Sequence, residues 1–182
     1  LKTYTIMMKN LSFLTLILLL VSCNYNLINK WENYDESDEI KTNAALENKR
    51  LQFKRIQSIS NDKNQLINGF EREISNFLEN EYDLTKELVH EKSIPEIQQS
   101  VIDGKLTYYK LSLFYLTRIY LIEFDKESYL NSIISINKNI LREAKSKDKI
   151  KNTNIYSLHG IPILLKDNIG FKGLPTTAGA HS

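Results

Sequence analysis

The sequence predicts an α/β fold in which charged helices precede the main domain. Loosely spaced apolar residues at three- and four-residue steps indicate charged helices over residues 39–89. The β-branched run at 130–137 (LNSIISIN) and the continuous apolar run at 161–165 (IPILL) are typical of strands, the second one buried on both faces. Together with the capped helices between them, these runs give the order helix, helix, strand, helix, buried strand, which is an α/β order.

The composition is that of a water-soluble globular protein. The chain has 182 residues, of which 42% are hydrophobic and 25% charged, enough for one domain with a short tail. The net charge is only +2, and basic and acidic residues alternate along the chain. Nucleic-acid binding needs a basic face or stripe, so this distribution argues against a nucleic-acid partner.

The N-terminal 23 residues have the pattern of an export signal. Lys9 precedes an apolar run over residues 11–21, which is shorter than the roughly 20 apolar residues that span a bilayer. The run ends in Leu-Val-Ser-Cys, which resembles the bacterial lipobox, where the cysteine is acylated. We therefore expect a signal peptide over 1–23, a lipid anchor at Cys23, and attachment to a membrane of the bacterial cell envelope. A signal peptide without acylation and a core helix with an incidental cysteine are the alternatives.

After this signal, residues 24–38 are polar and are predicted to form a tether. Two helices are expected next, over about 39–60 and 64–78. The role expected of these helices is that of an outer amphipathic layer.

The clearest local signals lie between residues 93 and 149. Ser93 and Glu96 form a capping box with Pro95 in the first turn, which predicts a helix that ends at Asp103-Gly104. Thr107 is a predicted N-cap for the next helix. A further helical pattern covers 139–149.

Residues 158–180 read LHGIPILLKDNIGFKGLPTTAGA. This string closely resembles the start of the amidase-signature region, in which Gly-Ile-Pro, a hydrophobic strand, Lys-Asp-Asn and a Thr-Thr-x-Gly turn follow one another. The resemblance extends more weakly back to residue 90. It implies that 90–182 form the N-terminal portion of the amidase-signature α/β/α fold, which has a mixed central sheet.

Lys166 is the candidate catalytic residue. It directly follows the apolar run 161–165, and desolvation at the end of a buried strand lowers the pKa of a lysine, so that the neutral amine can act as a general base. From the residues alone, a surface lysine or a lysine paired with Asp167 is the favoured interpretation, and only the resemblance reverses this order. The resemblance implies that Lys166 is the catalytic lysine, which acts through a serine in a cis peptide on a second serine that attacks the carbonyl. The family carries both serines after the Thr-Thr-x-Gly turn, so we expect residues 1–182 alone to be inactive.

Several neighbours of Lys166 are predicted to hold it and the following turn by hydrogen bonds: Asp167, Asn168, Thr176, Thr177 and Gly179. Gly160 and Pro162 are expected to shape the start of the strand. The three histidines, His90, His159 and His181, lack the spacing of metal ligands, and no cofactor is expected.

The functional prediction is a serine-dependent amidase that cleaves the C–N bond of a small-molecule or peptide carboxamide. One alternative is a fragment similar to the A subunit of the tRNA-dependent amidotransferase, which the export signal disfavours because charged tRNA is absent outside the cytoplasm. The other is a truncated, non-enzymatic envelope lipoprotein. An open reading frame after the codon for Ser182 would favour the enzyme, and a stop codon the lipoprotein.

Overall fold

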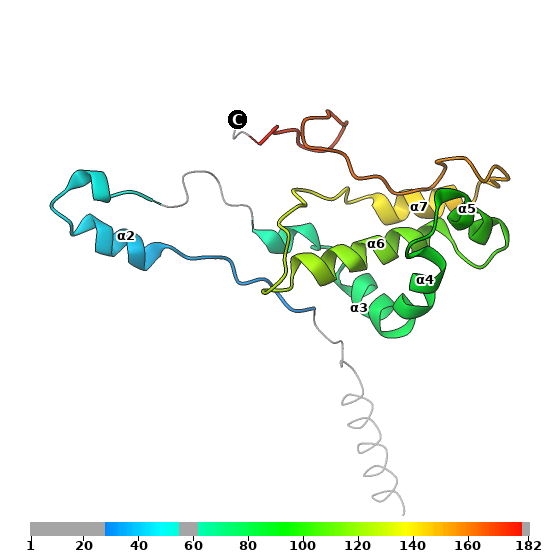
Figure 1. Ribbon diagram of the computed structural model, residues 1–182, viewed down its shortest axis with the longest axis horizontal. Coiled ribbons are helices and arrows are strands. Elements are labelled where there is room, and N and C mark those ends of the chain that lie inside the picture. Colours follow the sequence, from blue (N-terminus) through cyan, green and yellow to red (C-terminus); the bar gives the residue numbers. More distant parts are fainter. Residues whose placement is uncertain (1–27, 55–61, 180–182) are drawn as a thin grey trace, which may run out of the picture.

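The computed structural model describes residues 28–54 and 62–179, and the regular secondary structure within these ranges is helical (Figure 1). The predicted signal peptide and Cys23 lie outside the described residues. Six α-helices and two short 3₁₀ helices are present in the described ranges: α2 (Ser37–Ala44), η1 (Lys49–Leu51), η2 (Lys63–Leu66), α3 (Glu71–Asn80), α4 (Tyr82–Val89), α5 (Ile94–Ile102), α6 (Tyr108–Glu123) and α7 (Ile140–Asp148). In the part of the chain that the structure describes, no helix is both long and apolar enough to cross a membrane.

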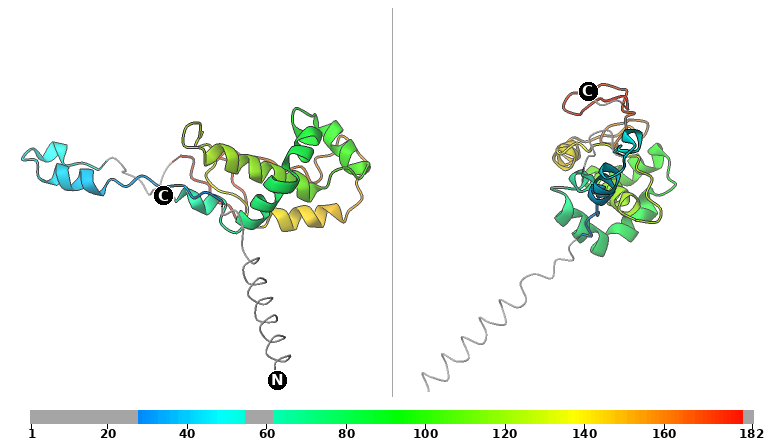
Figure 2. Two further views of the ribbon diagram at one scale, coloured as in Figure 1. Left: turned by 90° about the horizontal axis from the view of Figure 1, so that it is seen from below. Right: turned by 90° about the vertical axis from the view of Figure 1, so that its left-hand side faces the viewer.

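Helix α6 forms the centre of the core. It packs against α3, α4 and α7, and α4 in turn contacts α3 and α5. The end-on view in Figure 2 shows these helices gathered around α6. Because α6 is covered on several sides, apolar residues occur around most of its circumference. Its buried apolar side chains are Tyr108, Leu111, Leu113, Phe114, Leu116 and Tyr120.

The capping signals are confirmed in α5 and α6. The Glu96 carboxylate accepts from the backbone amide of Ser93 at 2.8 Å, as a capping box requires. Helix α5 ends at Ile102, and Gly104 follows in the left-handed conformation at φ +73°. The Thr107 hydroxyl oxygen accepts from the amide of Lys110 at 3.1 Å and begins α6.

Helix α7 lies beside α6. It also supplies a side chain, distant in sequence, that caps the N-terminus of α6. The Asp148 carboxylate accepts from the amides of Tyr108 at 2.7 Å and Tyr109 at 3.1 Å. These amides are among the N-terminal donors of α6 that have no partner within the helix. Negative charge is also favoured at this end of a helix, so Asp148 ties the two helices together.

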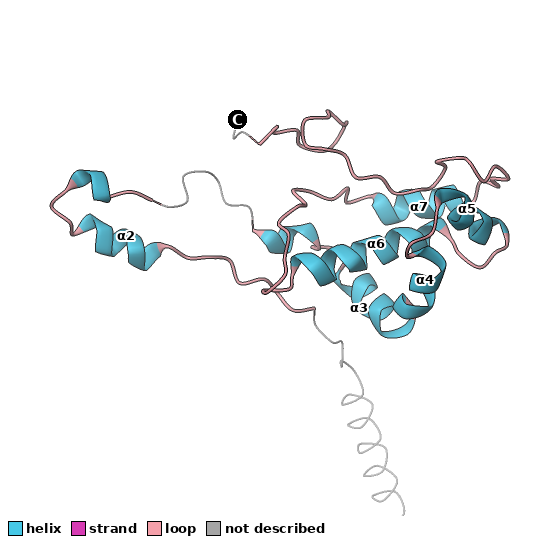
Figure 3. Cartoon of the chain, viewed as in Figure 1, coloured by secondary structure: helices cyan, strands magenta, loops and turns pink. Residues whose placement is uncertain are grey.

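The predicted mixed sheet is wrong for the described residues, which contain no strand (Figure 3). A strand needs a neighbour to receive its backbone hydrogen bonds, and neither apolar run has one there. Residues 130–137 instead form an irregular segment: the amides of Asn131 and Ser132 donate to the Glu123 carboxylate at 2.9 and 2.8 Å. Ile133 and Ile136 pack partly buried against the helices. Ile133 and Ile136 thus contribute to the helical core, whereas Ile134 is exposed.

The two helices expected over 39–60 and 64–78 are also shorter and interrupted. Helix α2 ends at Ala44, and only η1 follows before the end of the first described range. The second pattern divides into η2 and α3, separated by Gly69 at φ +87°. Helix α2 and η1 form an arm that extends away from helices α3–α7 (Figures 1 and 2).

A buried ion pair attaches the start of the described chain to the helices. The Lys63 ammonium lies 3.2 Å from the Glu123 carboxylate, with side-chain exposures of 9% and 2%. The same ammonium lies 4.2 Å from the ring centroid of Trp31 and 4.3 Å from that of Tyr129. Asn64 exchanges hydrogen bonds with the backbone of Trp31 at 2.8 and 2.9 Å. The Lys63 ammonium therefore lies beside two aromatic rings and the Glu123 carboxylate, and removing it would leave that buried carboxylate without a counter-charge.

Replacing Lys63 by methionine is expected to destabilise the protein by about 3 to 5 kcal/mol, because Glu123 would be left as an unpaired buried charge. Chemical denaturation measures this. The matched control is Lys126→Met, since Lys126 pairs with Glu32 at 3.1 Å but with exposures of 67% and 83%. Such a pair contributes about 0 to 1 kcal/mol. Equal losses in the two variants would contradict the buried role of Lys63.

Acid should weaken the same contact. Burial by itself raises the pKa of the Glu123 carboxyl, but the bonds from the Ser132 amide and hydroxyl and from Lys63 outweigh it and hold the pKa below the ordinary value of 4.5. A lowered native pKa means that this stabilisation is complete above the unfolded value and is lost as the pH falls through the native value.

Candidate active site

The segment that carries the amidase-like motif begins against the core. Gly160 has φ +72°, and a Cβ built on it would lie 2.3–2.6 Å from ring atoms of Tyr108. Tyr108 is 1% exposed, so its ring is held in place by the core. Only glycine permits both the left-handed backbone and this close approach to the ring. The glycine of the Gly-Ile-Pro string is therefore where the segment meets α6.

A buried glutamine holds the residues just before Gly160. The side-chain nitrogen of Gln98, on α5, donates to the carbonyl oxygens of Ser157 at 2.7 Å and His159 at 2.9 Å. Its side-chain oxygen accepts from the Tyr108 hydroxyl at 2.7 Å and from the Asn152 amide at 3.2 Å. Gln98 is fully buried, and all of its hydrogen-bonding capacity is used. We call these contacts of Gln98 with Tyr108, Asn152, Ser157 and His159 the Gln98 network.

Beyond this network, the prediction of a buried strand over 161–165 is wrong in the described structure. Ile161 packs partly buried against the core, but Ile163 and Leu164 are 62% and 76% exposed. Lys166, which follows them, is also exposed. The desolvation that the sequence predicted for its amine is therefore absent among the described residues, and the amine has no hydrogen-bond or ion-pair partner there.

Asp167 organises the Thr-Thr-x-Gly turn. Its carboxylate accepts from the amide of Thr177 at 3.0 Å, from the Thr177 hydroxyl, and from the amide of Gly179 at 3.2 Å. Its backbone carbonyl accepts from the amide of Ala178 at 3.2 Å. The hydroxyl and amide of Thr177 hold the pKa of the Asp167 carboxyl below its usual value of 3.8. Asp167 is therefore a carboxylate at neutral pH, fixed beside Lys166.

The turn itself needs a permissive backbone. Ala178 and Gly179 are both left-handed, at φ 51° and 75°, and two consecutive positive φ values reverse the chain so that its amides point at Asp167. The structure thus brings Asp167, Thr177 and Gly179 together next to Lys166. The other two predicted positions, Asn168 and Thr176, are exposed and make no side-chain hydrogen bond with described residues.

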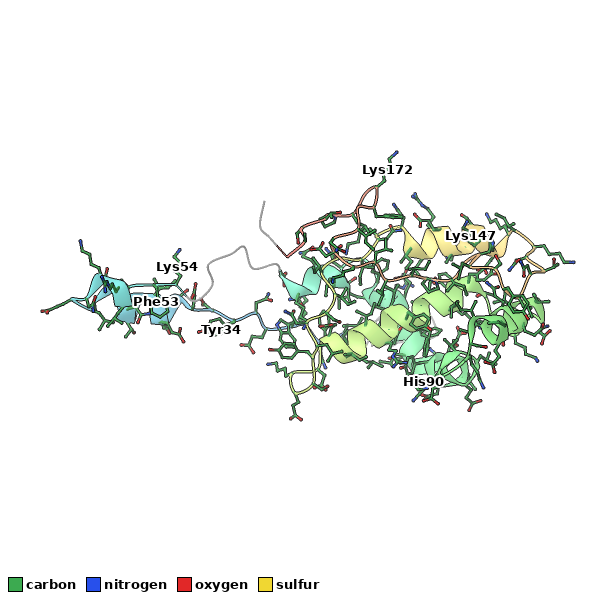
Figure 4. The ribbon with its side chains drawn as sticks, turned by 45° about the horizontal axis from the view of Figure 1, so that its top comes forward. Tyr34, Phe53, Lys54, His90, Lys147 and Lys172 are labelled. Atoms are coloured by element: carbon green, nitrogen blue, oxygen red, sulfur yellow. The ribbon has the colours of Figure 1, made fainter. Side chains whose placement is uncertain are left out.

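No metal centre is evident in the described ranges: no three His, Cys, Asp or Glu side chains there form a group that could hold an ion. His159 lies edge-on to the Tyr108 ring, with centroids 5.3 Å apart, and its Nε2 lies 3.2 Å from the carbonyl oxygen of Lys147. These contacts are structural. Lys172, four residues after Asn168, projects away from the helices (Figure 4).

Gln98 is the residue that the sequence interpretation missed. A signal was present, because Ile94, Ile97, Gln98 and Val101 stand at positions i, i+3, i+4 and i+7 of one helical face. A polar residue in such an apolar stripe is buried and needs partners. Its partners, Ser157 and His159, are 59 and 61 positions away in sequence, which no local pattern can identify.

Replacing Asp167 by asparagine is expected to loosen the turn. The NH2 group of asparagine would take the place of one carboxylate oxygen and would face N–H or O–H groups that now donate to that oxygen. Backbone amides of residues 177–179 should exchange with deuterium about tenfold faster. Hydrogen exchange followed by mass spectrometry measures this, with Asn168→Ala as the matched control. Unchanged exchange in Asp167→Asn, or equal acceleration in the control, would contradict the role of Asp167 in holding the turn.

Comparison with known proteins agrees with the motif. Residues 115–182 match the Amidase family, from the middle of α6 to the last residue of the sequence. The chain is also similar to the A subunit of glutamyl-tRNA(Gln) amidotransferase from Microcystis aeruginosa (strain NIES-843 / IAM M-2473), with 30% identity over 90 residues. That alignment covers 49% of this chain and 18% of the relative, so the chain spans about a fifth of that protein. No solved structure matches the chain. The segment 115–182, which contains Lys166 and the Asp167 turn, is therefore similar to the Amidase family.

Proposed function

We propose that Lys166 and the turn held by Asp167 form part of the active site of a serine-dependent amidase. This enzyme would hydrolyse the C–N bond of a small-molecule or peptide carboxamide. One observation carries the proposal: Lys166, with no partner for its amine among the described residues, directly precedes Asp167, whose carboxylate fixes the turn at 177–179. The match of residues 115–182 to the Amidase family supports it.

In the proposed reaction Lys166 is the general base. Its amine takes a proton through a serine in a cis peptide, as the resemblance implies, and this activates the hydroxyl of a second serine. That oxygen attacks the carbonyl carbon, the C–N bond breaks, and ammonia or an amine leaves with the transferred proton. Water then attacks the resulting ester, which releases the carboxylic acid and restores the serine hydroxyl. Asp167 holds the backbone after Lys166 against the turn at 177–179.

The test is ammonia release by the full-length protein from a panel of primary carboxamides, including aliphatic, aromatic and peptide C-terminal amides. At least one substrate should show saturable release. The folded protein failing to release ammonia from every member of the panel would overturn the proposal.

A second candidate follows from the similarity to the A subunit of glutamyl-tRNA(Gln) amidotransferase. The two candidates differ in location, because an amidotransferase needs charged tRNA and therefore the cytoplasm. We further propose that Cys23 is acylated and anchors the protein to a membrane of the bacterial cell envelope. The support for this is the Leu-Val-Ser-Cys sequence at 20–23, after the apolar run.

Metabolic labelling with radioactive palmitate decides between these locations. The wild-type protein should be labelled and should fractionate with membranes, whereas Cys23→Ser should not be labelled. Equal labelling of the two proteins, or none, would overturn the anchor. An unlabelled, cytosolic protein would favour the amidotransferase.

A further inference from the structure

Among the described residues, the Gln98 network is the last set of side-chain hydrogen bonds that joins the chain to the helices before Lys166. Ile161 packs against the core, but Ile163, Leu164 and Leu165 are all exposed, as is Lys166 itself. The next group of side-chain hydrogen bonds belongs to Asp167, and it joins this segment only to residues 177–179. Within the described ranges, the position of Lys166 relative to the helices therefore depends on how the chain is held at residues 157–161.

Three contacts hold residues 157–161, and all three are made by the side chains of Gln98 and Tyr108. Gln98 donates to the carbonyls of Ser157 and His159, which fixes the backbone on both sides of Leu158. Tyr108 donates its hydroxyl to Gln98 at 2.7 Å, which orients the amide so that its N–H groups face those carbonyls. The ring of Tyr108 also fills the space beside Gly160. Buried polar networks in which every member is satisfied fix one arrangement.

We propose that Gln98 is a positioning residue for the amidase reaction, and that it places Lys166 by fixing residues 157–160 against α5 and α6. This rests on the proposed function. Gln98 itself does not touch substrate or reacting atoms. Its effect passes through the backbone of the Gly-Ile-Pro segment to the lysine. A misplacement of about 1 Å far from the chemistry can cost about 100-fold in rate.

The test compares Gln98→Met with Gln99→Met in the full-length protein. Methionine fills the volume of glutamine but donates no hydrogen bond. Gln99 is the matched control because it is the next residue of the same helix and is exposed, and its side chain donates to the Asp103 carboxylate at 2.8 Å on the same helix end. Two readouts are taken from each variant: hydrogen exchange of the amides at 157–161, and the separate values of kcat and KM for the best carboxamide.

In Gln98→Met, exchange at 157–161 should accelerate about tenfold while the helices keep their protection. The kcat per folded molecule should fall by about 100-fold with KM changed less than about twofold, because the loss concerns the base and not substrate binding. Gln99→Met should match the wild type in both readouts. Unchanged exchange in Gln98→Met overturns the attachment, and faster exchange with an unchanged kcat overturns the positioning role.

Failure of the proposed function gives a different result. In that case the wild-type protein itself shows no amide turnover, so the catalytic role of Gln98 falls with it, while the exchange experiment still decides whether Gln98 holds the segment. If Gln98→Met does not fold, Tyr108→Phe replaces it, since the ring is kept and only the hydroxyl is removed. Exchange about threefold faster with a reduced kcat is expected there, and wild-type values of both would overturn the proposal.

Discussion

Lys166→Ala is expected to abolish amide turnover in the full-length protein and to leave the fold intact. The lysine is exposed, and no described side chain depends on its amine, so its removal costs little stability. In the proposed reaction it is the only group assigned to begin proton transfer from the serines. Loss of a general base reduces rates by about 100- to 10,000-fold. Steady-state kcat/KM with the best carboxamide is the measurement.

Lys172→Ala is the matched control for this experiment. Lys172 is an exposed lysine six positions later in the same segment, and it points away from the helices (Figure 4). Its removal changes the net charge by the same amount, so an effect of charge alone would appear in both variants. Wild-type kcat/KM in Lys166→Ala, or equal losses in the two variants, would exclude Lys166 as the base.

Gly160→Ala is expected to destabilise the protein by about 2 to 4 kcal/mol. Two costs add at this position. The first is a left-handed backbone at φ +72°, and the second is a Cβ only 2.3 Å from the nearest atom of the Tyr108 ring. Tyr108 cannot withdraw, because it is buried and its hydroxyl is bonded to Gln98. Residues 157–160 should detach from α6, and the unfolding free energy from denaturant titration should fall.

Gly173→Ala separates the two costs. Gly173 has φ +91°, but nothing lies within 4 Å of a Cβ built there. This variant therefore carries the backbone strain without the collision, and a loss of about 1 to 2 kcal/mol is expected. If Gly160→Ala lost no more stability than Gly173→Ala, the contact with Tyr108 would not constrain the segment.

Local signals in the sequence predicted the helices of the second half well. The Ser93–Glu96 box, Gly104 and Thr107 act on residues close to them in the sequence, so the bounds of α5 and the start of α6 follow from them. Helix α7 is likewise within one residue of the predicted range at each end. The Ser93–Glu96 and Thr107 caps each join residues three positions apart, so the local sequence is enough to predict them.

Local sequence signals could not predict in the same way whether strands form. An apolar run such as IPILL indicates burial, but burial and pairing depend on distant partners. In the described structure the run has no partner strand, and Leu164 is 76% exposed. The Gln98 network also could not be predicted from the sequence, because it joins residues about 60 positions apart. By contrast, Asp167 and the turn at 177–179 are ten to twelve positions apart and lie within one motif.

Lys166 and its turn belong, in our proposal, to a site where a serine attacks a carboxamide. The most direct measurement is the mass of the full-length protein after mixing with the best carboxamide and quenching in acid within a single turnover. We expect a fraction of the wild-type protein to gain the mass of the acyl group in place of one hydrogen, and Lys166→Ala to gain nothing. Carboxamide turnover without any acylated protein, or equal acylation of Lys166→Ala, would contradict the proposal.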